Sequence, residues 1–373
     1  MKITEIKSYI VGARQDNWVF VRVETDEGFS GLGECSVEGR EQTTVKAVEE
    51  VAPYYIGKDP FDTGVHLYKC FRDGYWGGCA VLCGALSAID TALWDIKGKA
   101  LGLPVSKLLG GAFKTRLRVY ANRWFFGGDT PDKLAALAHD TVSRGFTALK
   151  WDPFARAEQR ISRAQMKRAR AEIAAVRDAV GDEIDLLIEG HGRFNTHTAI
   201  EIAREMERYK PLFFEEPVMP ENLDALAQVR EKSPVAIAAG ERLYSKYDFG
   251  ELIRKNAADY LQPDIRYCGG VTELRDIGVM AQAAFLSVAP HNVHGLVGTV
   301  ATLQTLTTIP NAAILEYSIE QTAVACGLFK TNIVYKDGYV EIPQEPGLGI
   351  TMDEEQAKRM PFVRHSMIEK MFE

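Results

Sequence analysis

The sequence lacks a long hydrophobic run, since none of its stretches approaches the roughly 20 consecutive apolar residues that a transmembrane helix needs. It also lacks an excess of positive charge: 44 lysines and arginines face 51 acidic residues, which gives a net charge of −7. Nucleic-acid binders concentrate positive charge, so this balance argues against such a partner. The opening Met1-Lys2-Ile3-Thr4-Glu5 has no apolar core of the signal-peptide kind. We therefore expect a cytoplasmic protein with neither a membrane nor a nucleic-acid partner.

Cysteine is scarce, with six residues scattered through the chain. Cys79 and Cys83 could form half of a metal site, but no second pair follows them. Free thiols in a reducing compartment are the better interpretation.

Another absence concerns the glycine-rich phosphate turn that an open, doubly wound sheet usually carries after its first strand. Tyr120-Ala121-Asn122-Arg123 stands at that point instead, which disfavours such a sheet.

The first part of the chain predicts a small α+β domain over residues 1–112. Segments 3–11 and 18–25 alternate apolar and polar residues, and a tight turn at Asp26-Glu27-Gly28 leads into 29–34, as in an antiparallel meander. Helical spacing of apolar residues predicts helices over 40–55 and 80–101. Gly102 ends the second of these, as a glycine after the last helical residue usually does. A length of 373 residues leaves room for a larger second domain.

Residues 113–320 predict a parallel β/α barrel. Strands are expected over 117–122 and 148–152, and six further apolar strands each run into a charged or titratable residue. These residues follow one another at steps of 26, 26, 23, 27 and 25, about the length of one βα unit, and are Glu189, Glu215, Glu241, Asp264, His291 and Glu316. Eight strands close a barrel whose strand ends share one face. The tail, 321–373, contains short strands and is expected to return to the first domain.

Glu189, Glu215 and Glu241 would converge at that face. Three carboxylates brought together would repel one another strongly, and a hard divalent cation removes the repulsion. Since the set contains neither cysteine nor histidine, it favours Mg²⁺ over zinc. The alternative is that each glutamate pairs with a local base, for example Glu241 with Arg242.

Two histidines and one lysine are candidates for acid–base chemistry. His191 lies two residues past Glu189, and His291 ends a strand across the barrel, so the imidazoles could flank a bound substrate. Asp264 is placed to hold the Nδ1–H of His291 and raise its basicity. A satisfied structural contact is the alternative for either histidine.

Lys150, on the second strand, could bind a carboxylate or serve as a second base. Glu316, on the eighth, could donate a hydrogen bond if like charges kept it protonated. An ion pair of Lys150 with Glu316 or Glu189 remains equally open.

These features together resemble the enolase superfamily and, within it, the mandelate racemase subgroup, over nearly the whole chain. The motifs that carry the resemblance are Ile89-Asp90-Thr91-Ala92-Leu93-Trp94-Asp95-Ile96-Lys97-Gly98-Lys99, Phe214-Glu215-Glu216-Pro217, Ala239-Gly240-Glu241-Arg242, Gln262-Pro263-Asp264 with Gly269-Gly270-Val271-Thr272, and Pro290-His291. The resemblance implies an α/β fold in which an α+β capping domain, built from the N-terminal segment and the C-terminal tail, covers a modified TIM barrel. It also implies Mg²⁺ at the three glutamates, a dyad of His291 with Asp264, and a carboxylate at Glu316 that hydrogen-bonds an enolate. Barrels of this family commonly self-associate, so we expect a homo-oligomer.

Within the subgroup, a histidine two places after the first metal ligand is similar to the sugar-acid dehydratases of the galactonate type. The resemblance gives His191 the role of the acid that protonates the departing hydroxyl. Two positions depart from the family pattern. Glu189 stands where aspartate is usual, and Asp152 stands where racemases carry the second lysine of a Lys-x-Lys motif. The second departure argues against lysine-based racemisation.

The predicted function is Mg²⁺-dependent dehydration of a small-molecule carboxylate, an aldonic or aldaric acid. His291 would abstract the α-proton, and His191 would assist loss of the β-hydroxyl to give a 2-keto-3-deoxy acid. Residues expected to bind the substrate are Arg193, Asn17, Trp18, Tyr75 and Trp76, although core packing is an alternative for the aromatic ones. A racemase, epimerase or cycloisomerase using the same enolate is one alternative function, and a non-catalytic binding paralogue is another.

Overall fold

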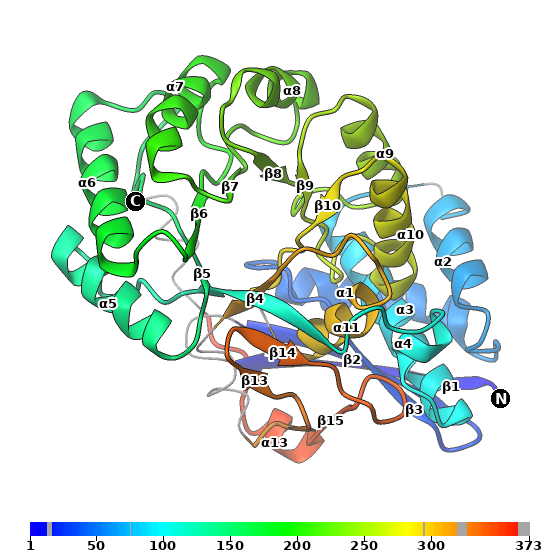
Figure 1. Ribbon diagram of the computed structural model, residues 1–373. Coiled ribbons are helices and arrows are strands. Elements are labelled where there is room, and N and C mark those ends of the chain that lie inside the picture. The colour runs from blue at the N-terminus through cyan, green and yellow to red at the C-terminus, as the bar shows by residue number, and fades with distance from the viewer. Residues whose placement is uncertain (13–16, 75, 294, 319–326, 365–373) are drawn as a thin grey trace.

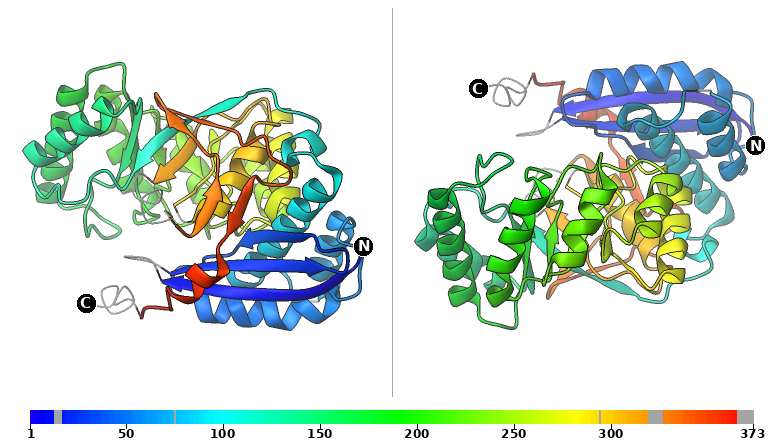
Figure 2. Two further views of the ribbon diagram at one scale, coloured as in Figure 1. Left: turned by 90° about the horizontal axis from the view of Figure 1, so that it is seen from below. Right: turned by 90° about the horizontal axis from the view of Figure 1, so that it is seen from above.

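The computed structural model describes residues 1–12, 17–74, 76–293, 295–318 and 327–364. Two bodies pack together: a barrel, and beside it an antiparallel sheet with its own helices (Figures 1 and 2). Both parts have the predicted architecture. No helix among the described residues is long and apolar enough to cross a membrane.

The N-terminal sheet consists of β1 (Ile3–Gly12), β2 (Asn17–Thr25) and β3 (Ser30–Glu34), paired antiparallel in that order. The predicted helices are α1 (Glu41–Tyr55) and α3 (Ala80–Leu101), while α2 (Thr63–Arg72) lies in a segment for which the sequence analysis gave no helix. α3 approaches β3 very closely, because a Cβ at Gly33 would lie 1.9 Å from the Ala88 carbonyl oxygen. Glycine in β3 therefore lets the middle of the helix pack closely against the sheet.

The barrel strands are eight in number and parallel, as predicted. They are β4 (Arg116–Asn122), β5 (Ala148–Trp151), β6 (Asp185–Glu189), β7 (Phe213–Glu215), β8 (Ile237–Ala239), β9 (Tyr260–Leu261), β10 (Ser287–Val288) and β11 (Leu315–Ser318). Neighbours in sequence pair in parallel from β4 to β10, and β11 returns to pair with β4. The gap between β10 and β11 is closed by hydrogen bonds such as the one from the Ala313 amide to the Val288 carbonyl (2.9 Å).

In the described part of the chain, seven helices lie outside the barrel, one after each strand up to β10. They are α5 (Pro131–Ser143), α6 (Arg163–Val180), α7 (Thr196–Met206), α8 (Leu223–Lys232), α9 (Lys246–Arg254), α10 (Gly270–Ala283) and α11 (Leu296–Leu306), and a short α4 (Val105–Leu108) joins the two domains. Inside the barrel, large and small side chains such as Tyr120, Phe213 and Ala238 fill the lower layer. This layer closes the floor beneath the strand ends.

The C-terminal tail contacts both domains. β14 (Tyr339–Glu341) pairs antiparallel with barrel strand β4 and forms a hairpin with β13 (Tyr335–Lys336), so this part does not return to the small domain as expected. β12 (Phe329–Thr331) pairs with β15 (Ile350–Met352), and α13 (Glu354–Lys358) then packs against β1. The Gly12 amide donates to the Met360 carbonyl at 2.8 Å. Phe329 of β12 also packs edge to face on Phe20 of β2, with ring centroids 5.2 Å apart. The described tail therefore contacts the barrel through β13 and β14 and the N-terminal sheet through β12 and α13.

Candidate active site

Three glutamates meet at the carboxyl ends of adjacent strands. Glu189 and Glu215 are the last residues of β6 and β7 and stand side by side in register, and Glu241 follows β8. One carboxylate oxygen from each lies within 4.8 Å of the others. Arg242 does not pair with Glu241, the local alternative, but donates two hydrogen bonds to Glu216 at 3.0 and 2.6 Å.

The donor set suits a hard divalent cation. All three groups offer carboxylate oxygen, the ligand that Mg²⁺ prefers. Burial and the neighbouring Glu189 charge raise the pKa of Glu215 to about 7. Glu215 Oε2 is also fully buried with no hydrogen-bond partner among the described residues. A cation would satisfy this oxygen and offset the repulsion, so the residues fit the metal that the sequence predicted.

Lys150 lies between this cluster and Glu316. Its Nζ is 2.7 Å from Glu215 Oε1, 2.8 Å from Glu316 Oε1 and 3.5 Å from Glu189 Oε2. Both open ion-pair alternatives are therefore present, together with a third partner. Burial opposes the charge of this ammonium, but Glu215 and Glu316 outweigh it and raise the pKa of Lys150. The lysine is thus a buried cation that balances the glutamates.

Glu316 differs from the expectation that like charge would keep it protonated. Its carboxylate accepts hydrogen bonds from Asn122 Nδ2 at 2.6 Å and from the Asn292 amide at 2.8 Å, in addition to Lys150. Burial favours the neutral acid, but the charges of Lys150 and His291 lower the pKa of Glu316. With cationic and N–H donors on both oxygens, this group is ionised and accepts hydrogen bonds.

His291 and Asp264 form the predicted dyad. His291 Nδ1 lies 2.7 Å from Asp264 Oδ2, and His291 Nε2 faces the acidic cluster, 3.7 Å from Glu241 Oε2. Arg266, which is fully buried, donates to the same aspartate through Nε at 2.8 Å and through Nη2. Burial lowers the pKa of His291, but Glu241 and Asp264 raise it to about 10.

His191 has a carboxylate partner too, which the sequence analysis missed. Its Nδ1 lies 2.8 Å from Asp152 Oδ2, and its backbone amide donates to Glu189 Oε1 at 2.6 Å. Partial desolvation lowers the pKa of His191, but the charges of Glu189 and Asp152 raise it to about 9. Arg193, which was expected to bind substrate, donates hydrogen bonds from both terminal nitrogens to Asp152.

Two other residues expected to bind the substrate, Asn17 and Trp18, lie inside the protein, and a third, Trp76, lies on its surface. Asn17 is buried, and its side chain bonds both the amide and the carbonyl of Val363. Trp18 is buried in the hydrophobic core beside Phe20, which is the packing alternative. Trp76 is highly exposed, and Tyr75 lies outside the described residues.

Four groups of the site escaped the sequence analysis: Asp152, Arg266, Asn122 and Gln262. The amide of Gln262, directly after β9, is completely buried, and neither its oxygen nor its nitrogen has a partner among the described residues. Asp152 and Asn122 end strands in the same way as the glutamates, so their position at strand ends was the available signal. The partner of Arg266, in contrast, depends on the turn after β9.

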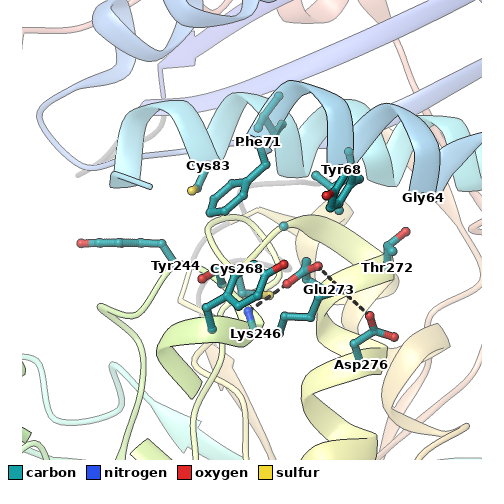
Figure 3. A pocket seen from close by; sticks show the side chains of 15 residues that line it. Gly64, Tyr68, Phe71, Cys83, Tyr244, Lys246, Cys268, Thr272, Glu273 and Asp276 are labelled. Carbon is teal, nitrogen blue, oxygen red and sulfur yellow. Dashed lines mark hydrogen bonds and ion pairs between the residues drawn. The ribbon is translucent and has the colours of Figure 1, made fainter. Parts of the chain in front are cut away.

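A cavity of about 240 Å³ lies away from the glutamates, between α2 and α3 of the small domain and α10 of the barrel (Figure 3). Its aromatic wall includes Tyr68 and Phe71. Lys246 pairs there with Glu273 at 2.9 Å and with Asp276 at 2.8 Å. This cavity shares no lining residue with the strand-end cluster.

Two family models together match most of the chain. Residues 5–110 match the N-terminal domain of mandelate racemase / muconate lactonizing enzyme, and residues 133–357 match the family described as enolase C-terminal domain-like. The boundary between them agrees with the change from the antiparallel sheet to the barrel.

Among similar proteins is the D-galactonate dehydratase of Xanthomonas euvesicatoria, 36% identical over 365 residues that cover 96% of this chain and 94% of that protein. The D-gluconate dehydratase of Thermoproteus tenax is 36% identical over 342 residues, 90% of this chain and 68% of that protein. A solved mandelate racemase/muconate lactonizing enzyme from a Jannaschia species superposes with a TM-score of 0.90 at 30% identity, covering 97% of this chain and 98% of that one. A mandelate racemase/muconate lactonizing enzyme-like protein from a Roseovarius species gives a TM-score of 0.90 at 31% identity, with 97% and 96% covered.

Proposed function

The chain belongs to the mandelate racemase / muconate lactonizing enzyme family of the enolase superfamily, and from this membership we propose that it is a Mg²⁺-dependent dehydratase of a sugar acid. The substrate class is an aldonic or aldaric acid, and the product is a 2-keto-3-deoxy acid and water. The similarity to D-galactonate and D-gluconate dehydratases supports the reaction class.

The observation that carries the proposal is the placement of two aspartate-held imidazoles around the acidic cluster. His191 follows β6 and His291 follows β10, and three strands separate these two on either side of the closed barrel. The histidines therefore stand on opposite sides of the strand ends, with the glutamates between them. A proton can be removed at one carbon and delivered to a leaving group at the next.

Glu189, Glu215 and Glu241 would hold Mg²⁺, which when bound supplies positive charge that acidifies the α-proton of a carboxylate and stabilises negative charge. A cation at the glutamates would offset the Glu241 charge that raises the pKa of His291 and so favour the neutral ring. The Nε2 of this neutral His291 accepts the α-proton, while Asp264 keeps the proton of Nδ1 in place. Lys150 adds a fixed positive charge beside the glutamates. His191 Nε2 donates a proton to the β-hydroxyl, whose C–O bond breaks, so that water leaves and the enol becomes the ketone.

A dehydration assay tests the function directly. The purified protein with MgCl₂ is incubated with a panel of aldonic and aldaric acids, and keto acid is measured with semicarbazide. At least one acid is expected to yield a keto acid. Inversion at the α-carbon without keto acid would show an epimerase, and no turnover combined with no Mg²⁺ binding would indicate a binding paralogue.

Metal binding is tested separately by titration calorimetry of the chelator-treated protein with MgCl₂. The E215Q variant is expected to bind Mg²⁺ at least about tenfold more weakly, because one anionic ligand is lost. The matched control is E172Q, which changes a buried glutamate that pairs with Arg168 on the outer helix α6 at 2.6 Å. Equal Mg²⁺ affinity in the parent and in E215Q would contradict the metal assignment.

A further inference from the structure

We propose that Asp152, anchored by Arg193, is a positioning residue that fixes the imidazole of His191 for proton donation to the leaving group. The inference rests on the proposed function, and it gives a role to the aspartate that stands where relatives of the racemase type carry a lysine. In this proposal Arg193, which was expected to bind the substrate, holds Asp152 in place inside the site.

Asp152 is firmly held. Its Oδ1 accepts hydrogen bonds from the Phe154 amide at 2.9 Å and from Arg193 Nη1 at 3.1 Å. Its Oδ2 accepts from Arg193 Nη2 and lies 2.8 Å from His191 Nδ1. A guanidinium that donates to both oxygens fixes the plane of the carboxylate, so the direction in which Oδ2 faces the imidazole is fixed as well.

The ring of His191 depends on this carboxylate. The backbone is fixed by the bond from the His191 amide to Glu189 and by a left-handed conformation with φ of 50°. The side chain, however, is 54% exposed, and among the described residues its ring contacts Asp152 and, at 3.3 Å, Arg193 Nη2. A half-exposed ring has several rotamers available, and a carboxylate at Nδ1 selects one of them. The same bond places a proton on Nδ1 and leaves Nε2 to face the substrate.

The other histidine is held in the same way. Asp264 bridges His291 Nδ1 and the guanidinium of Arg266, as Asp152 bridges His191 Nδ1 and that of Arg193. The two arrangements arise from different strands, β9 with β10 and β5 with β6. Each side of the acidic cluster therefore has an imidazole whose tautomer and orientation are set by a carboxylate and an arginine.

The distinguishing experiment compares two events on one substrate in D₂O. The variant is D152N, and NMR measures exchange of the α-proton while semicarbazide measures keto acid. Because His291 and the metal ligands are unchanged, D152N is expected to keep α-proton exchange within a few-fold of the parent. Dehydration is expected to fall by about 10²-fold or more, the usual contribution of a general acid.

Two control variants are measured in the same way as D152N. D264N, which disturbs the base, is expected to lower exchange and dehydration together. D185N removes a partly exposed carboxylate at the opposite end of β6, where Asp185 pairs with Arg118 at 2.6 Å, and is expected to change neither. Equal losses of exchange and dehydration in D152N would overturn the proposal, as would dehydration at the parent rate.

A second measurement needs no substrate, so it separates this inference from the proposed function. In protein labelled with ¹⁵N-histidine, the hydrogen-bonded Nδ1–H of His191 is identified by its loss in H191N. This signal is expected in the parent and R193K and absent in D152N. Its persistence in D152N would overturn the positioning role whatever the substrate is, whereas failure of the whole acid panel in the parent would count against the proposed function alone.

Discussion

Replacing Lys150 with methionine should strongly destabilise the metal-free protein. The Lys150 side chain is 4% exposed and its ammonium contacts three carboxylates, two of which are completely buried. Methionine has a similar length but carries no charge, so it leaves Glu215 and Glu316 without their cation. Breaking a buried ion pair by removing one partner costs about 3–5 kcal/mol. Most of this loss should fall on Glu215, because Glu316 keeps hydrogen bonds from Asn122 and Asn292.

The assay is urea unfolding of parent and K150M in chelator and in excess MgCl₂. In chelator the free energy of unfolding should fall by about 3–5 kcal/mol. The deficit should be smaller at pH 6 than at pH 8, because Glu215, whose pKa already lies at about 7, can then protonate instead of remaining an unpaired anion. Mg²⁺ should reduce the deficit further, because a cation at the glutamates replaces the charge that K150M removes and so stabilises the variant more than the parent.

The matched control is K246M. Lys246 also pairs with two carboxylates, Glu273 and Asp276, but its side chain is 33% exposed. Solvent screens such pairs, so this variant should lose no more than about 1 kcal/mol. A K150M protein that unfolds in chelator at pH 8 within about 1 kcal/mol of the parent would refute the claim that Lys150 balances the glutamates.

Two further predictions concern the contacts between the domains. Burial raises the pKa of Asp90 from 3.8 to about 7, although the carboxylate accepts hydrogen bonds from Thr272. The stability that proton binding by Asp90 contributes is complete below pH 3.8 and is lost as pH rises through 7. D90N should therefore gain up to about 4 kcal/mol relative to the parent between pH 4 and pH 8, and a pH-independent difference in urea unfolding would contradict this. Asp95 accepts from the Leu32 amide at 3.0 Å, the Leu348 amide at 2.8 Å and Lys99 at 2.6 Å, so D95A should lose about 3–5 kcal/mol, against less than about 1 kcal/mol for a surface change such as E49A.

The positions of the chemical groups along the chain could be predicted from the sequence. Apolar segments that end in a charged residue every 23 to 27 positions imply repeated βα units, and side-chain direction in a strand follows from a local period of two. Parallel strands closed into a barrel share one face of strand ends. For these reasons the fold was predicted correctly, and Glu189, Glu215 and Glu241 were expected together before any tertiary contact was known.

The partners of these groups were decided by the tertiary structure. Lys150 meets Glu316 because barrel closure brings β11 beside β4, a pairing between residues almost 200 positions apart, and it meets Glu215 through the pairings of β5 with β6 and of β6 with β7. Asp152 meets His191 through the pairing of β5 with β6. Likewise, β14 pairs with the barrel because the beginning of β4, residues 116–118, presents a strand edge to it. Local pattern sets where a side chain points, whereas register, closure and burial across distant segments determine which group it meets and which charge it carries.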